Sequence, residues 1–346
     1  MSPKYTLNSS FKRFSQRNNI FGRLNWDKSF DEYDVSMYSR IPSILSQNAP
    51  GYDRIDFAMA LSSWAVYNYF NGAFSWKKLG DTQSVMAEPT LPRYEIKKGN
   101  IGSFTTKMKA AVKASGASLV GIAPYDARWT YTRDRQNNPI ELPSKMTSVI
   151  ALAVEMDPLG LGTSPTLISN HATGIGYSRM AFLVSIVAEL IRNLGYGAIP
   201  CGNDTALSIP IAIDAGLGQL GRNGLLVTRE FGSRVRLCKV LTDMPLEHDK
   251  PIDFGVTDYC RRCKECAEAC EAEAISFDDE PSFRTTCISN NQGILRWAVD
   301  VEKCYRFWIE NGGDCSTCIV VCPFNLQTGG KRDVRPEEFW EHAEKK

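Results

Sequence analysis

The chain has 346 residues, 43% of them apolar and 23% charged, so it is neither a disordered tail nor a protein of more than about three domains. Forty basic residues against thirty-nine acidic ones leave a net charge of +1, without the basic surplus typical of nucleic-acid-binding proteins. Nine of the eleven cysteines fall between Cys260 and Cys322. Because a chain of this size buries a core without disulfides, the crowding predicts a metal-binding C-terminal module.

The N-terminal hundred residues are aromatic and polar. Positions 1–40 contain neither an apolar signal stretch nor a twin-arginine pair, which predicts a cytoplasmic protein or a mature form whose leader has been removed. The uncharged stretch 57–76 is long enough to span a membrane, but its serines, asparagines, glycine and tyrosines favour a buried or interfacial helix.

From about position 103 the pattern indicates mixed helices and strands. Helices are predicted over 103–115 and 178–194. Strands are predicted over 119–123, 149–154, 225–228 and 235–241. Ser103 is the expected N-cap of the first helix, Gly116 and Gly195 are the expected stops, and 208–215 fits either a helix or a strand. Such a mixture over about 150 residues predicts one α/β or α+β domain, which a polar tail follows.

The C-terminal cysteines form two reciprocal runs. These are Cys260-x2-Cys263-x2-Cys266-x3-Cys270 and Cys315-x2-Cys318-x3-Cys322-Pro323. In bacterial ferredoxins with two clusters, a tight loop aims three thiolates at one [4Fe–4S] cluster, and the fourth cysteine reaches the other cluster. This crossover predicts that the ligands of the first cluster are Cys260, Cys263, Cys266 and Cys322.

The second cluster needs one ligand in addition to Cys270, Cys315 and Cys318. Cys304 and Cys287 compete for that place, and we favour Cys304 because it lies nearer to Cys315 in the chain. Zinc ribbons also use paired CxxC elements, but they take four cysteines per ion and rarely show this ladder of spacings. Two [4Fe–4S] clusters are therefore favoured over zinc and over disulfides.

Clusters of this kind only carry electrons, so the preceding 250 residues must use them. Residues 216–221 have the GxGxxG spacing, but no clear strand precedes them and no acidic ribose partner follows in context. A tight glycine turn that packs against a flat surface is the better interpretation. Only His171, His248 and His342 are present, which argues against a multi-histidine metal site.

Several strings resemble those of the corrinoid-dependent reductive dehalogenases. In the last third they are 289–293 (SNNQG), Trp297, 304–308 (CYRFW) and 315–325. Earlier ones are 195–196, Asn203, 215–218 (AGLG), 221–222, 243–246 (DMPL) and 249–255 (DKPIDFG), with looser matches at 11–14 and 25–27. The resemblance runs from about Gly116 to Asn325 and is most specific in the last third.

The resemblance implies an α+β fold, with a nitroreductase-like cobamide-binding domain fused to a C-terminal two-cluster bacterial ferredoxin-like domain. The expected parts are an aromatic-rich region that contributes to the pocket (1–100), the cobamide-binding core (101–255), the ferredoxin-like domain (256–328) and a polar tail (329–346). Members of this family hold the cobamide base-off without a DxHxxG histidine, and that motif is absent here.

Three catalytic residues are carried over by position from the resemblance. Tyr177 looks like the family's proton donor, Arg236 like the arginine beside it, and Asn203 like the pocket asparagine. A tyrosine is a weak acid at pH 7, and a guanidinium that stabilises the phenolate makes donation easier. The structural alternative for Tyr177 is a ring that packs in the core.

The remaining site predictions are cofactor contacts and a pocket wall. Gly216 and Gly218, together with Asn203, are expected to contact the cobamide. Trp308 and Trp64 are candidates for an aromatic substrate wall, with core packing as the alternative for each.

The implied activity is that of an oxidoreductase of anaerobic respiration, which replaces halogen by hydrogen in an organohalide using cob(I)alamin and two [4Fe–4S] clusters. The expected substrate is an organohalide, and the sequence does not identify the electron donor. A membrane-anchor subunit and a homodimer are both compatible with the resemblance. No nucleic-acid partner is expected. The family suggests the outer face of the cell membrane after leader removal, whereas the leaderless chain leaves a cytoplasmic location open.

The nearest rival is epoxyqueuosine reductase, which resembles this architecture with the same cofactors but acts on tRNA. The strings 288–291 and 323–325 are closer to the dehalogenases, and no basic tract for tRNA is present. Cys287, however, matches a cluster ligand of that rival. A non-enzymatic electron carrier with a large accessory domain is a rival from another class.

Overall fold

The computed structural model describes residues 5–69 and 92–345. Its strands are β1 Leu119–Pro124, β2 Ser148–Glu155, β3 Ala198–Cys201, β4 Gln219–Leu220, β5 Leu226–Val227 and β6 Val235–Thr242. The helices of its first two-thirds are α1 Ile20–Arg23, α2 Ile41–Leu45, α3 Arg54–Ser63, α4 Ala65–Tyr69, α5 Ile101–Ala114, α6 Pro158–Gly162, α7 Leu167–Asn193 and α8 Ser208–Asp214. The last third holds α9 Val256–Arg262, α10 Glu265–Glu268, α11 Val301–Asn311, α12 Thr317–Val320, α13 Pro323–Leu326 and α14 Pro336–Ala343.

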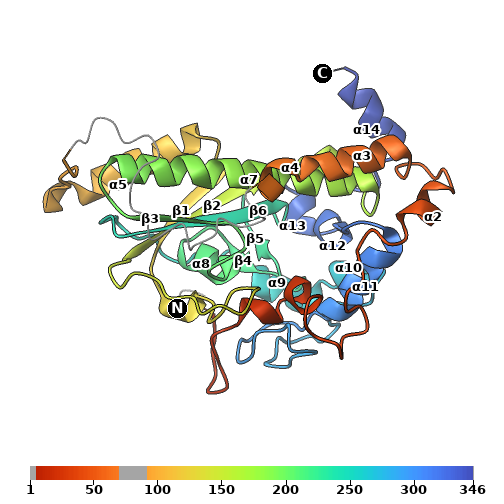
Figure 1. Ribbon diagram of the computed structural model, residues 1–346, viewed down its shortest axis with the longest axis horizontal. Helices are drawn as coiled ribbons and strands as arrows, with labels where there is room; N and C mark the ends of the chain where they lie inside the picture. Colours follow the sequence, from red (N-terminus) through yellow and green to blue (C-terminus); the bar gives the residue numbers. More distant parts are fainter. Residues whose placement is uncertain (1–4, 70–91, 346) are drawn as a thin grey trace.

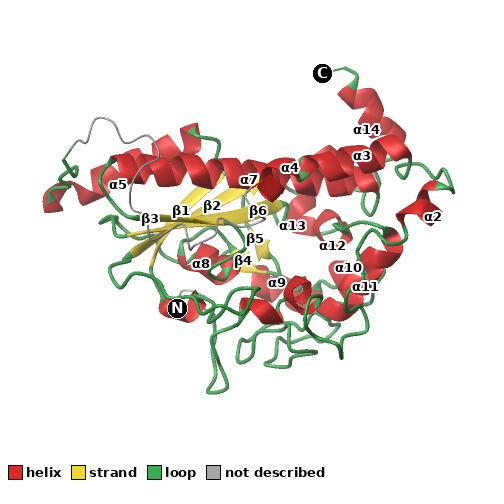
Figure 2. Cartoon of the chain, in the orientation of Figure 1, coloured by secondary structure: helices red, strands yellow, loops and turns green. Residues whose placement is uncertain are grey.

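An antiparallel sheet in the order β1-β2-β6-β3 forms the centre of the molecule. Leu152 of β2 lies opposite Val120 of β1 and Cys238 of β6. Successive side chains of a strand point to opposite faces, so Leu152 packs on the side of α7, whereas Val149 packs on the side of α8. Figure 2 shows helices above and below this layer of strands. Because both faces are covered, β2 is apolar nearly throughout.

Helix α7 is the longest helix among the described residues, and it starts eleven positions before the predicted 178. Its first turns contain Ser169, Thr173, Gly174 and Gly176, which do not follow an apolar helical pattern, yet they are buried against neighbouring segments. Within 5–69 and 92–345, α7 is the helix long and apolar enough to cross a membrane, but 56% of its most apolar window is buried inside the protein. It lies along the central sheet (Figure 1).

Most predicted elements are confirmed within two residues, and the ambiguous stretch 208–215 is helix α8. Gly116 and Gly195 adopt the expected left-handed conformation, with φ of +110° and +82°. The N-cap prediction is wrong, because α5 begins at Ile101 and Ser103 lies in its first turn. The stretch 57–76 does not begin as one span: α3 ends at Ser63, α4 follows, and positions 70–76 lie outside the described residues.

The cysteine-rich last third consists of short helices joined by loops, and the N-terminal segment runs beside it (Figure 1). An isolated β-bridge joins Leu7 to Ile294, and the backbone of Phe11 lies against Gly293. Helix α14, inside the polar tail, is an element that the sequence did not predict. The segments carrying the cysteines are therefore held by contacts with the rest of the chain more than by long elements of their own.

Candidate functional site

Four cysteine thiols line one hollow, with about 320 Å³ of space free of atoms. They are Cys260, Cys263, Cys266 and Cys322. Burial, with a smaller contribution from the neighbouring thiols, raises the pKa of Cys260 to about 11 and that of Cys266 to about 12. Thiols crowded away from water need cationic iron to ionise, so this donor set fits a cluster. The grouping is the one predicted from the crossover of the two runs.

The second group brings Cys304, and not Cys287, to the remaining thiols. Burial raises the pKa of Cys304 to about 12, with the neighbouring charges of Cys315 and Cys270 adding to the effect. Burial also raises the pKa of Cys318, again with Cys315 and Cys304 as neighbours. Cys287, by contrast, interacts with the charge of Arg296. These electrostatic neighbours favour Cys304 as the fourth member of this group.

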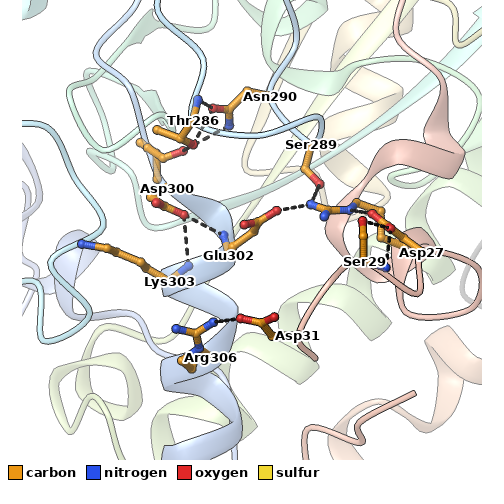
Figure 3. Close-up of polar contacts among 12 residues, drawn as sticks. Asp27, Ser29, Asp31, Thr286, Ser289, Asn290, Asp300, Glu302, Lys303 and Arg306 are labelled. Atoms are coloured by element: carbon orange, nitrogen blue, oxygen red, sulfur yellow. Dashed lines mark hydrogen bonds and ion pairs between the residues drawn. The ribbon is translucent and has the colours of Figure 1, made fainter. Parts of the chain in front are cut away.

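Helix α11, which carries Cys304, is fixed by a polar network with the N-terminal segment (Figure 3). The buried Arg23 donates hydrogen bonds to Asp27 (2.8 Å), to Ser289 (3.2 Å) and to Glu302 on α11. Asp300 caps the same helix by accepting from the backbone N–H groups of the second and third helical residues. The N-terminal segment thereby sets the position of one predicted cluster ligand.

Tyr177 on α7 is the centre of an aromatic and polar cluster. Asn203 Nδ2 donates a hydrogen bond to the Tyr177 hydroxyl at 2.9 Å, and the Arg236 guanidinium lies 4.9 Å from the centre of the ring. The Trp64 ring stacks on Tyr177 at 4.6 Å, and Tyr67 makes an edge contact at 5.1 Å. The structure therefore brings together all three residues of the predicted catalytic set.

Two glycines in the helical turn before Tyr177 permit this close approach. A Cβ on Gly174 would lie 1.9 Å from Ser63 Oγ and 2.7 Å from Trp64 Nε1, and one on Gly176 would lie 2.9 Å from Arg236 Cγ. Only the absence of a side chain lets the end of α3 and strand β6 approach α7 so closely. The two glycines before Tyr177 thus allow Trp64 and Arg236 to reach its ring.

Arg236 faces the ring of Tyr177, and its Nε lies 3.1 Å from Met156 Sδ. Nearby, Asp314 is 4% exposed, and burial raises its pKa to about 7, against the opposing effect of the Arg236 charge. Thr173, one turn before Tyr177, lies 3.5 Å from Ser316 through their hydroxyl oxygens. The loop that carries Cys315 therefore adjoins the Tyr177 cluster.

The other predicted site residues lie elsewhere or have internal partners. Trp308 of α11 packs with Phe21 (5.9 Å) and Tyr305 (6.4 Å), and its indole N–H has no hydrogen-bond partner among the described residues, so its place in a substrate wall stays a prediction. Cβ atoms on Gly216 and Gly218 would lie 2.6 Å and 2.2 Å from backbone oxygens of the protein itself. Close backbone packing explains both glycines, and their contact with a cofactor stays a prediction.

Sequence reasoning missed several buried polar residues at these sites. Arg222 contacts the first cysteine run, Arg23 contacts α11, and Asp314 lies between Arg236 and the second run. Only Arg222 had a signal in the sequence, because it follows Gly221 within a string that resembles the dehalogenases. For the other two, one sequence cannot distinguish a buried charge from a solvated one.

The comparisons with known proteins agree with this geometry. Residues 259–332 match the family model described as "4Fe-4S dicluster domain". A tetrachloroethene reductive dehalogenase of Desulfitobacterium hafniense is 38% identical over 305 residues, which is 76% of this chain and 54% of the relative. An epoxyqueuosine reductase of Lactococcus garvieae is 35% identical over 120 residues, 34% of this chain and 32% of the relative.

One solved structure, described as a reductive dehalogenase structure that suggests a mechanism for B12-dependent dehalogenation, matches with a TM-score of 0.71 at 21% identity, covering 99% of this chain and 46% of that one. The fold and the cysteine pattern define an α+β protein with an iron–sulfur module. The chain is a sequence relative of the reductive dehalogenases and spans about half the length of the curated relatives that it matches. The predicted fold class and family resemblance are confirmed.

Proposed function

We propose that this chain carries out reductive dehalogenation, in which an organohalide exchanges its halogen for hydrogen: R–X + 2e⁻ + H⁺ → R–H + X⁻. The observation that carries the proposal is the phenol of Tyr177, held at its oxygen by Asn203 (2.9 Å) and along its ring by Arg236. The similarity to curated reductive dehalogenases over three-quarters of the chain supports the same activity.

Two [4Fe–4S] clusters would deliver the electrons one at a time. The first would be ligated by Cys260, Cys263, Cys266 and Cys322, and the second by Cys270, Cys304, Cys315 and Cys318. Cys315 Sγ lies 4.0 Å from Ser164 Oγ, just before α7, and the neighbouring Ser316 contacts Thr173. The second cluster would therefore be the nearer one to Tyr177, and electrons would pass from the first to the second.

A base-off cobamide fits the residues around the first turns of α7. Ser169 Oγ, Asn170 Nδ2 and Asp314 Oδ1 are buried polar atoms with no hydrogen-bond partner among the described residues. Such atoms destabilise a fold unless a polar group meets them, and the amide-edged rim of a corrin is such a group. When bound, the cobamide would supply the low-valent cobalt that cleaves the carbon–halogen bond. Asn170 and Asp314 would hold it.

The residues of this chain would manage the proton. Departure of halide after two-electron reduction leaves negative charge at carbon, which a proton must quench. Because the Tyr177 oxygen accepts from Asn203, its own O–H is free to donate toward the substrate. The phenolate that remains is stabilised by the Asn203 amide and by the positive charge of Arg236.

Replacing Tyr177 by phenylalanine tests this function. Anaerobically reconstituted Tyr177→Phe should retain iron and cobalt yet lose nearly all halide release from a chlorinated ethene. Tyr67→Phe is the matched control, because it removes a hydroxyl from the aromatic neighbour of Tyr177 and leaves the Asn203 contact in place. Halide release by Tyr177→Phe at the wild-type rate, with both metals bound, would exclude Tyr177 as the proton donor.

An activity on tRNA, as the name epoxyqueuosine reductase implies for that relative, has weaker support. Its match covers 34% of this chain, against 76% for the dehalogenase. A tRNA-binding assay separates the two functions: binding of a tRNA stem loop together with an absence of halide release would reverse our assignment.

A further inference from the structure

Arg222 is a fully buried cation in contact with the first cysteine run. It lies in the turn between β4 and β5 and is 1% exposed. Its guanidinium donates to four backbone carbonyls: Cys260 (2.6 Å and 3.1 Å), Cys263 (3.0 Å), Ser276 (2.8 Å) and Asp278 (2.7 Å). Two of these four residues carry predicted ligands of the first cluster.

The charge of Arg222 has no anionic partner in the described part of the chain. No carboxylate there lies within ion-pair distance of its guanidinium, which instead sits 4.8 Å from the centre of the Trp297 ring. Asp279, the nearest acidic influence, is exposed and paired with Lys264 at 2.7 Å. Carbonyl dipoles satisfy the N–H groups without cancelling the charge, and a buried unpaired charge is costly.

The hollow beside Arg222 is where a negatively charged group could meet this cation. Arg222 lines the same 320 Å³ hollow as the four thiols of the first group. A cluster held by four thiolates is anionic and gains a further negative charge when it takes up an electron. A positive charge fixed in a low-dielectric interior stabilises that reduced state more strongly than a surface charge would.

The second cysteine group has a buried carboxyl beside it instead. Asp314 is the residue before Cys315, and Arg236 is the cation that acts on it. The two groups therefore differ in the kind of buried group that adjoins them. Hydrogen bonding and nearby charge are among the factors that set cluster potentials.

We propose that Arg222 raises the reduction potential of the cluster held by Cys260, Cys263, Cys266 and Cys322. This inference rests on the proposed binding of two clusters and is independent of the role of Tyr177. Arg222 is a positioning residue for the cysteine loop and the electrostatic partner of its cluster.

Redox titration of the reconstituted holoprotein, followed by electron paramagnetic resonance with dithionite as the one-electron reductant, tests the proposal. Arg222→Gln should lower one cluster potential by at least 59 mV, a tenfold change in the reduction equilibrium. Arg222→Lys keeps the positive charge, so it should shift the same cluster potential by less than 59 mV. The affected signal is assigned by its loss in Cys263→Ala. Arg261→Gln, which removes an exposed, paired cation next to Cys260 in α9, should leave both potentials unchanged.

Iron content separates this test from that of the function: a chain that binds no clusters fails before any potential is read. Arg222→Gln with full iron and two unchanged potentials would overturn the proposal. Should neither Arg222 variant hold iron, Asn223→Asp provides the test, because it puts a carboxylate into the same hollow, although it gives up a hydrogen bond to the Cys318 carbonyl. It should lower the potential of the first cluster. An unchanged value in a variant with full iron would show that a charge in this hollow does not set the potential, which rejects the role of Arg222.

Discussion

The sheet core and the cysteine module stabilise their functional side chains by different means. Tyr177 and Arg236 stand on a long helix and a central strand, around which Leu152 and Val184 have no exposed surface. The cysteines stand on loops and on helices as short as the four residues of α10 and α12. Apolar packing fixes the first region, whereas the second lacks enough regular structure to position its thiols alone.

Buried arginines supply the missing support in the cysteine module. Arg222 holds the first run, Arg23 holds α11, and Arg234 ties the end of the second run to β6 by donating to Asn325 Oδ1 (2.8 Å). Each arginine belongs to a segment outside the module and reaches into it. We therefore expect the module to depend on its neighbours and on its clusters more than the core does.

Removing iron tests this difference most strongly. A chelator under reducing conditions should abolish ordered packing of the cysteine module, because thiols that the clusters held as thiolates become crowded and unpaired. Hydrogen exchange should rise across α9 to α13 and stay unchanged in β2, β6 and α7. Equal loss of protection in both regions would show that the core also requires the clusters.

Substituting the two competing cysteines sharpens the picture of the module. Cys304→Ala should lower the iron content by about four atoms per chain, to half of the expected total of about eight. Cys287→Ala should retain all of it, because Cys304, and not Cys287, has Cys315 and Cys270 as its main thiol neighbours. Iron and acid-labile sulfide counts on anaerobic protein decide between them, and the reverse pattern would make Cys287 the ligand.

Replacing one buried arginine should reduce the free energy of unfolding by less than the loss of a cluster does. Arg23→Gln leaves Asp27 and Glu302 without their buried cation, which should reduce the free energy of unfolding by about 3–5 kcal/mol. Arg284→Gln is the control: it removes an exposed cation that pairs with the exposed Asp278, and should reduce the free energy of unfolding by about 0–1 kcal/mol. Equal losses in denaturant titrations of the two variants would refute a special role for Arg23.

The sequence predicted most of the core because its strands and helices repeat apolar residues at regular spacing. The start of α7 was predicted wrongly. The first turns of this helix contain small and polar residues, which are buried because α3 packs closely against them, as Trp64 does against Gly174. Apolar periodicity cannot report that kind of packing. The tail helix α14 was missed for a related reason, because none of its residues is buried.

Cysteine spacing predicted one thiol group and left one ligand of the other undecided. Spacing fixes which thiols share a loop, but the distance between Cys304 and Cys315 depends on how α11 is anchored to the N-terminal segment. The same limit applies to the two tryptophans: Trp64 and Trp308 are alike in the sequence, and only the fold shows that Trp64 alone stacks on Tyr177. The burial of Arg23 and Arg234 could not be predicted from the sequence, because charged side chains usually lie at the surface.

The smallest expected effect is a pH dependence of the free energy of unfolding that arises from His248, in the sheet core. Desolvation lowers the pKa of His248, whose Nε2 lies 3.1 Å from Ser148 Oγ at the start of β2. The unfolded chain then binds more protons below about pH 6.5, so the free energy of unfolding should fall as the pH drops through that range. The loss should stay below about 0.5 kcal/mol, since the side chain is partly solvated. His248→Gln should flatten this slope in urea titrations, and an unchanged slope would show that His248 is not the source of the acid sensitivity.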